Sequence, residues 1–225
     1  MNATLADDLL LIALDAEARR SPRCDSGVLP YGLAGAVVTE LLLRGAVEAT
    51  PRGLLAAGRP TGDALLDDAA ARIGASRRRR GVKGWVHALA GRSAGLRPRL
   101  SRRLAAAGVL HEEAHRLLGV LPVRRYAVAD QAALAELRAR VRAALLGPGT
   151  LDARSASLVG LVSACGLVDS LVARGERRAA RARAAAIRDA DLVAQPVRAA
   201  IQEAQTAVAA GATAAVVASS AGAAG

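Results

Sequence analysis

Two apolar segments near the N-terminus constrain the fold most, because both are typical of helices buried in a protein core. Residues 4–20 (TLADDLLLIALDAEARR) predict a helix capped at Thr4, with two carboxylates, Asp7 and Asp8, in the first turn, where they suit the helix dipole. Residues 31–45 (YGLAGAVVTELLLRG) repeat leucine and valine at four-residue spacing, and the small residues between them permit close packing. We therefore expect a core built mainly from helices.

The rest of the chain adds further helices and two hairpins. A helix capped by Thr61 or Asp63 should run to about Ile73, and Asp130 should cap a later amphipathic helix. Another helix should turn four apolar side chains inward, those of Val82, Trp85, Val86 and Leu89. Two strand–turn–strand patterns predict hairpins, at residues 46–58 and 108–128. The expected architecture is mainly α, with a hairpin inserted after a helix in two places.

The positive charge of the chain is confined to one window. Between Arg77 and Arg125 there are thirteen Lys and Arg residues against two acidic ones, Glu112 and Glu113, which gives a net charge of +11. The rest of the chain holds eighteen basic and eighteen acidic residues, so the window carries all of the formal net charge of +11. Such a local field favours a polyanionic partner: nucleic acid, an anionic bilayer or an acidic protein.

Residues 116–128 (RLLGVLPVRRYAV) place an apolar run directly before two arginines. The run could be a buried strand that leaves the core, or a loop that dips into a membrane whose headgroups the arginines contact. Each arginine near an anionic surface contributes about 1 kcal/mol, and each aliphatic side chain that leaves water adds about 1.5–3 kcal/mol when fully buried. Together these contributions predict reversible peripheral membrane binding.

Residues 111–115 (HEEAH) match the H-E-x-x-H signature of zinc proteases. That chemistry needs both histidines one turn apart on a helix, and here the motif lies beside a β-like apolar run with no evident third ligand. We also find no Ser-His-Asp or Cys-His arrangement and no glycine-rich phosphate loop. We therefore expect no catalytic residue, no metal site and no cofactor, and predict that the protein is not an enzyme.

Two alternatives to membrane binding remain open. Residues 37–58 (VVTELLLRGAVEATPRGLLAAG) could be the last helix and wing of a winged-helix protein that binds DNA. Only Arg52 and Arg59 make this first hairpin basic, and the chain holds one Trp, two Tyr and no Phe for stacking on single strands, so we disfavour nucleic acid. An adaptor whose basic face grips an acidic protein tail is the other alternative.

The ends of the chain and its cysteines favour a cytoplasmic setting. Asp7 and Asp8 lie where a signal peptide needs basic residues, and Cys24 and Cys165 are too far apart to form a C-x-x-C motif. Residues 206–225 are rich in Ala, Gly and Ser and too weakly apolar for a membrane span. We predict a helical domain over residues 1–205 and an Ala/Gly-rich tail, a helix end or disordered, over residues 206–225.

Several segments, in this order, resemble the Golgi phosphoprotein 3 family. They are LADDLLLIALDAE, YGLAGAVVTELLLRGAVE, PTGDALLDDA, GW-x-x-x-L at Trp85, RPRLSRRLAAAGVL and HRLLGVLPVRRY, and the likeness covers roughly Leu5 to Ala204. The resemblance implies a single-domain helical bundle ringed by amphipathic helices, with two short β-hairpins, one of them protruding. It also implies a non-enzymatic peripheral membrane protein. Family members of eukaryotes bind phosphatidylinositol 4-phosphate on the Golgi and hold glycosyltransferases there.

The family's headgroup pocket carries over only in part. Arg97 falls on a pocket arginine and Arg99 on a neighbouring one, whereas Ala34 and Ala94 stand where the family has arginines. The loop before Tyr31 has no aromatic residue where the family has a Trp. The resemblance therefore implies binding of anionic, phosphoinositide-like lipid through an incomplete pocket.

The family's protruding hairpin corresponds to Val109 through Val123, with a tip expected near residues 113–118, which would place HEEAH on the turn. We expect Leu117 and Leu118 near this tip, reaching a membrane or a partner subunit, and Val120, Leu121 and Val123 returning to the core.

We predict a protein that docks reversibly on the cytoplasmic face of an anionic membrane. Arg97, Arg99, Arg92 and Arg102 would contact headgroups, and the hairpin would act as a wedge. The partners implied are anionic membrane lipid and client membrane proteins, with self-association through the hairpin as a further candidate.

Overall fold

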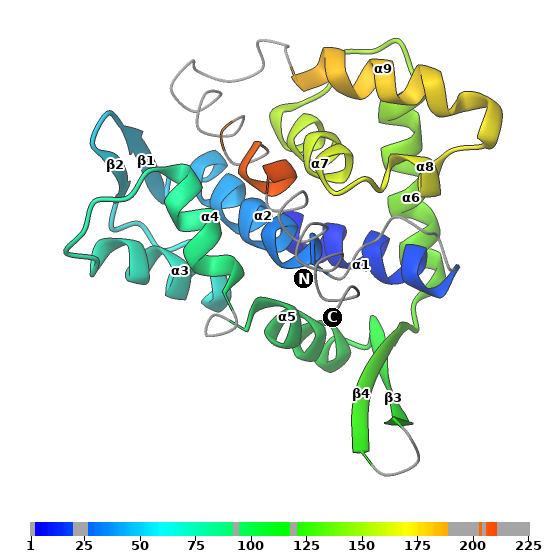
Figure 1. Cartoon of the computed structure of the whole chain (residues 1–225), viewed down its shortest axis with the longest axis horizontal. Helices are drawn as coiled ribbons and strands as arrows, with labels where there is room; N and C mark the ends of the chain where they lie inside the picture. The colour runs from blue at the N-terminus through cyan, green and yellow to red at the C-terminus, as the bar shows by residue number, and fades with distance from the viewer. Residues whose placement is uncertain are drawn as a thin grey trace, which may run out of the picture.

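The computed structural model describes residues 3–19, 27–91, 95–117, 121–188, 203 and 206–210, with backbone alone at residues 114–117, 121–124 and 188. Helices dominate this part of the chain, and two antiparallel hairpins complete it (Figure 1). The predicted class, a mainly α helical bundle with two short hairpins, is confirmed.

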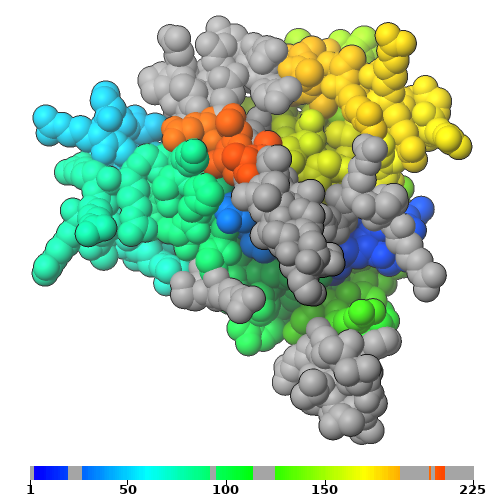
Figure 2. Space-filling view, in the orientation of Figure 1, coloured from blue at the N-terminus to red at the C-terminus, as the bar shows by residue number. Residues whose placement is uncertain are grey.

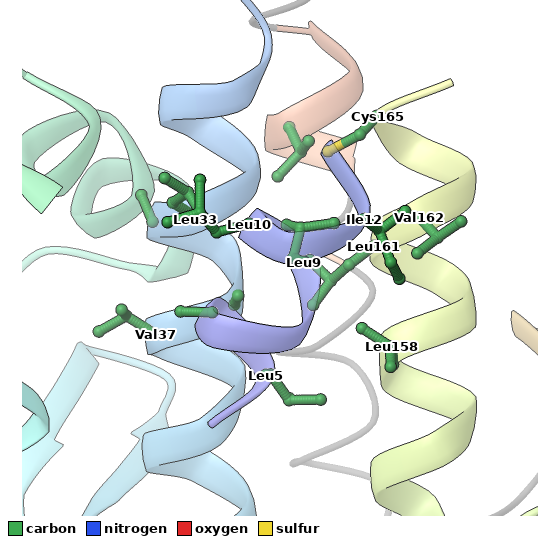
Figure 3. Close-up of a cluster of buried hydrophobic side chains, with 14 of the residues drawn as sticks. Leu5, Leu9, Leu10, Ile12, Leu33, Val37, Leu158, Leu161, Val162 and Cys165 are labelled. Carbon is green, nitrogen blue, oxygen red and sulfur yellow. The ribbon is translucent and has the colours of Figure 1, made fainter. Parts of the chain in front are cut away.

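Helices α1 (Leu5–Ala18) and α2 (Leu29–Leu43) form the centre of the core. α1 packs against α2, α5 (Leu96–Ala106), α6 (Gln131–Leu146) and α7 (Ala153–Ala164). Figure 3 shows the leucines and isoleucine of α1 between Leu33 and Val37 of α2 and Leu158, Leu161 and Val162 of α7. The aliphatic N-terminal segments are therefore buried on nearly all sides, as their sequence predicts.

Side-chain caps start four of the helices. The Thr4 hydroxyl accepts a hydrogen bond from Asp7 N, and Thr4 N donates to Asp7 Oδ2 at 2.8 Å, which closes a capping box at the start of α1. Asp63 caps α3 (Ala64–Gly74), Asp130 caps α6 and Asp152 caps α7. The predicted caps at Thr4 and Asp130 are confirmed, and of the two residues predicted for α3 the cap is Asp63.

The remaining helices are α4 (Val82–Ala90), α8 (Val168–Leu171), the 3₁₀ turn η2 (Arg174–Glu176) and α9 (Arg177–Arg188). α4 lies against α2 and buries the four apolar side chains predicted for it. Residues 206–210 are helical, and Ala207 and Val208 are buried in the core. No helix among the described residues is long and apolar enough to cross a bilayer.

The first hairpin, β1 (Val47–Thr50) and β2 (Gly53–Ala56), packs against the segment that joins α3 to α4. Leu54 N donates to Arg80 O at 2.9 Å. Gly53 has a φ of 121°, and a Cβ at this position would lie 2.5 Å from the same carbonyl oxygen. Glycine is therefore required where the hairpin meets this segment.

The second hairpin, β3 (Leu110–Leu117) and β4 (Leu121–Val128), protrudes from the body of the protein below α5 (Figure 1). Its register runs from Leu110 opposite Val128 to Leu117 opposite Leu121. The expectation that HEEAH lies on the turn was therefore wrong, because residues 111–115 belong to β3, whose distal end is Leu117. Glu113 pairs with Arg125 across the strands, and such opposite charges favour a longer ladder.

Candidate functional site

Helix α5 carries most of the predicted headgroup-binding residues. Leu96, Leu100 and Leu104 are buried against the body of the protein, at a spacing of four residues. The helix contains no acidic residue, and four arginines, Arg97, Arg99, Arg102 and Arg103, lie outside this apolar row. Its sequence therefore gives α5 an apolar side that packs against the body and a set of arginines around the rest of the helix.

Two of the predicted arginines are held by carboxylates of neighbouring helices. Arg97 Nη2 donates to Glu17 Oε2 at 2.8 Å, at the end of α1, and Arg99 Nη1 donates to Asp68 Oδ2 at 2.7 Å, on α3. Both arginine side chains remain partly exposed. Exposed pairs of this kind contribute about 0–1 kcal/mol, so an anionic ligand can displace these carboxylates at modest cost.

Of the other two predicted arginines, Arg102 and Arg92, the structure describes Arg102 alone. Arg102 is exposed on α5, and no ion pair involves it within the part of the chain that the structure describes. Arg92 lies outside the described residues. Arg97, Arg99 and Arg102 all lie on α5, with Arg97 paired to α1 and Arg99 to α3.

A fourth arginine of α5, Arg103, points inward instead. Its Nη2 lies 2.5 Å from Asp7 Oδ1, and its Nη1 lies 2.5 Å from Asp63 Oδ2. The same Nη2 donates to the Thr4 hydroxyl at 3.2 Å. Arg103 therefore ties α5 to the N-terminal caps of α1 and α3. The sequence analysis counted Arg103 only as positive charge. Its position between Leu100 and Leu104, next to the apolar side of the helix, could have predicted that it points inward.

The base of the second hairpin continues directly from α5. Val109 N donates to Leu104 O at 2.9 Å, and β3 lies against α5. The described side chains of lower β3, those of His111, Glu112 and Glu113, are exposed and polar. The exposed side chains described on lower β3 are therefore all polar.

The residues predicted for that distal part are not described in full. Leu117 is described by its backbone at the end of β3, and Leu118 lies outside the described residues. Val120 is also outside them, and Leu121 and Val123 are described by backbone alone. Their contacts with a membrane, a partner or the core stay predictions.

The position that corresponds to an arginine on the second helix of the family is closed to a headgroup here. Ala34 is fully buried within α2, and Ala94 lies outside the described residues. Near the start of α2, Tyr31 makes an edge-to-face contact with His87 of α4, with the ring centroids 5.3 Å apart. This end of α2 therefore presents aromatic rings instead of a guanidinium.

A second part of the basic window lies on the segment before α4. Arg77, Arg78, Arg79 and Arg80 are exposed, and the Arg80 guanidinium stands over the ring of Trp85 at 5.3 Å from its centroid. In the space-filling view, α3, α4 and α5 form one surface along the left and lower edge of the molecule (Figure 2). The window is thus divided among this segment, α5, the second hairpin, which carries Arg116, Arg124 and Arg125, and α4, which carries Lys83.

The histidine motif lies on a strand and not on a helix. His111 lies in a strand, where its Nε2 is 3.1 Å from Glu113 Oε1. Within the described ranges, no three His, Cys, Asp or Glu side chains gather in a way that could hold a metal ion.

A family model matches most of the chain. The model described as Golgi phosphoprotein 3 (GPP34) matches residues 5–204, a stretch that includes α1, α5 and both hairpins. No curated protein matches the chain.

Proposed function

The chain belongs to the Golgi phosphoprotein 3 family, and from this premise we propose that it is a non-enzymatic peripheral membrane protein that binds anionic phospholipid headgroups through α5. One observation carries the proposal: α5 presents Arg97, Arg99 and Arg102 on a helix without acidic residues, and it leads straight into a protruding hairpin.

Headgroup binding at α5 proceeds by exchange of partners. A lipid phosphate that approaches Arg97 or Arg99 replaces the Glu17 or Asp68 carboxylate. At Arg102 the phosphate has no carboxylate of a described residue to displace. Three arginines near an anionic surface contribute about 3 kcal/mol in total. That amount supports reversible docking, and apolar side chains at the hairpin tip, Leu117 and Leu118, add to it by leaving water.

The preference among anionic lipids depends more on the negative charge of the headgroup than on the shape of a pocket. Position 34 of α2 is a buried alanine and offers no guanidinium to a headgroup, so the positive field comes from Arg97, Arg99 and Arg102 of α5. A phosphoinositide such as phosphatidylinositol 4-phosphate carries more negative charge than a lipid with a single phosphate diester, so it binds more tightly. The protein would dock on the cytoplasmic face of a membrane and engage client membrane proteins or a second copy there.

Vesicle co-sedimentation tests this proposal. Full-length protein should sediment with vesicles that contain anionic lipid and remain in solution with neutral phosphatidylcholine vesicles. The double variant Arg97→Glu/Arg99→Glu should lose most of the binding, because it replaces two attractive charges with two repulsive ones. Arg52→Glu, a single charge reversal on the first hairpin, and Arg52→Glu/Arg72→Glu, which matches the double charge change away from α5, serve as controls.

Two results would reject the proposal. One is equal binding to neutral and anionic vesicles, and the other is unchanged binding of the α5 double variant. Tight binding to duplex DNA in a gel shift, without vesicle binding, would instead favour the DNA-binding alternative. The contact of the first hairpin with Arg80 O speaks against its use as a free wing.

A further inference from the structure

A polar cleft lies away from α5, among the N-terminal part of α1, the C-terminal part of α2, α6 and the start of α7. Its volume is about 540 Å³, which is within the usual range for small-molecule sites. The described residues of α5 take no part in its lining. The charged groups on its lining are the carboxylates of Asp8, Glu40 and Asp152 and the guanidinium groups of Arg44, Arg140 and Arg154. Asp152 caps α7, where it accepts from Ser155 N at 2.9 Å and from the Ser155 hydroxyl at 2.7 Å.

Glu40 is buried at this cleft, and both of its carboxylate oxygens already accept hydrogen bonds from the protein. Its carboxylate accepts from Leu5 N at 2.8 Å and from Arg44 Nε at 2.8 Å. Arg154 Nη1 donates to both of its oxygens, at 2.8 and 2.5 Å. Glu40 therefore fixes two guanidinium groups at the cleft and is not itself available to a ligand.

Asp8 is a buried carboxylate without a short hydrogen bond. The residue is 5% exposed, yet its closest described side-chain donors are Arg154 Nη2 at 3.5 Å and Arg140 Nη2 at 3.6 Å. Both distances exceed those of ordinary charge-assisted hydrogen bonds. Burial raises the pKa of the Asp8 carboxyl, against the opposing effect of these two arginines. A cationic donor in the cleft would supply the missing hydrogen bond.

Arg140 offers the complementary charge. Its side chain is 54% exposed, and the long contact with Asp8 is its one ion pair among the described residues. Most of its N–H donors are therefore available to an anion in the cleft. Arg44 and Arg154, held in place by Glu40, lie on the same lining and strengthen the positive field there.

We propose that this cleft binds a compound in which a primary ammonium group stands beside a phosphate, as in phosphoethanolamine, either free or as a lipid headgroup. The ammonium group donates to Asp8, and the phosphate accepts from Arg140. The buried carboxylates would repel an isolated anion, and the three guanidinium groups would repel an isolated cation. The mixed lining therefore selects a zwitterion.

Isothermal titration calorimetry of the full-length protein tests this site with three probes: O-phosphoethanolamine, phosphocholine and inorganic phosphate. Phosphoethanolamine should bind at least about tenfold more tightly than phosphocholine, because a trimethylammonium group has no N–H to donate. Arg140→Gln should weaken its binding at least about tenfold. Arg142→Gln is the matched control, since Arg142 lies on the same helix, pairs with Glu176 and does not line the cleft.

Asp8→Asn should also lose the preference for the ammonium compound, and circular dichroism verifies that the variant is folded. Arg140 is half exposed, so Arg140→Gln tests the site even if Asp8→Asn fails to fold. Equal affinity for phosphoethanolamine and phosphocholine, unchanged binding of Arg140→Gln, or no binding of phosphoethanolamine by the unmodified protein would overturn the proposal.

The source of the ligand is decided by competition. If vesicles that contain phosphatidylethanolamine displace free phosphoethanolamine, the site takes a lipid headgroup; if only the free compound binds, it takes a soluble ligand. Arg97→Glu should keep phosphoethanolamine binding, so failure of lipid docking at α5 and failure of this cleft are separable.

Discussion

Replacement of Arg103 by glutamine should destabilise the protein far more than replacement of any other α5 arginine. Its side chain is 21% exposed, whereas the Asp7 side chain that it contacts is only 2% exposed. Loss of one partner of a buried ion pair costs about 3–5 kcal/mol, because the other charge remains buried without compensation. Asp7 keeps hydrogen bonds from Thr4 N and the Thr4 hydroxyl, both at 2.8 Å. We therefore expect the lower end, about 3 kcal/mol.

For a chain of this length, 1 kcal/mol corresponds to about 2–4 °C in the melting temperature, so Arg103→Gln should lower Tm by about 6–12 °C. Urea denaturation followed by circular dichroism gives the free energy of unfolding directly. Arg99→Gln is the control, since its exposed pair with Asp68 should contribute no more than about 1 kcal/mol. If Arg103→Gln and Arg99→Gln lower stability equally, Arg103 does not clamp α5 to the two helix caps.

Three further predictions address the lipid surface and the buried carboxylates. Glu17→Gln and Asp68→Asn should each tighten binding to anionic vesicles, by about fivefold, because each removes the carboxylate that competes for an α5 arginine; unchanged affinity would contradict this. Leu117→Glu or Leu118→Glu should weaken vesicle binding about tenfold without lowering Tm, whereas a large loss of stability would indicate core positions. The pKa of Asp8 in the folded state lies above its ordinary value of 3.8. The stability of the unmodified protein relative to Asp8→Asn should therefore rise as pH falls through that folded-state pKa. A difference in unfolding free energy that is constant with pH would exclude a raised pKa.

Local signals in the sequence predicted the helices well. Thr4, Asp63 and Asp130 cap helices as their positions indicate, because a cap depends on residues within one turn of it. The end of β3 was misplaced because its length depends on cross-strand pairs such as Glu113 with Arg125, which are twelve residues apart in the chain. Pairing of distant residues leaves little trace in a single sequence.

The candidate site was predictable as a basic helix but not as a set of contacts. The arginines of α5 are evident from RPRLSRR, yet the carboxylates that hold Arg97 and Arg103 come from α1 and α3 and become neighbours only after folding. The cleft at Asp8 and Arg140 likewise joins four helices, so no segment of the sequence contains its pattern.

Membrane contact by α5 is tested most directly with a spin label at position 102, in a chain whose two native cysteines are replaced by alanine. Addition of anionic vesicles should reduce the mobility of the label and shield it from a water-soluble relaxation agent, while a label at position 52 on the first hairpin remains accessible. Equal accessibility of the two labels, with the protein bound to the vesicles, would show that another face of the molecule meets the membrane.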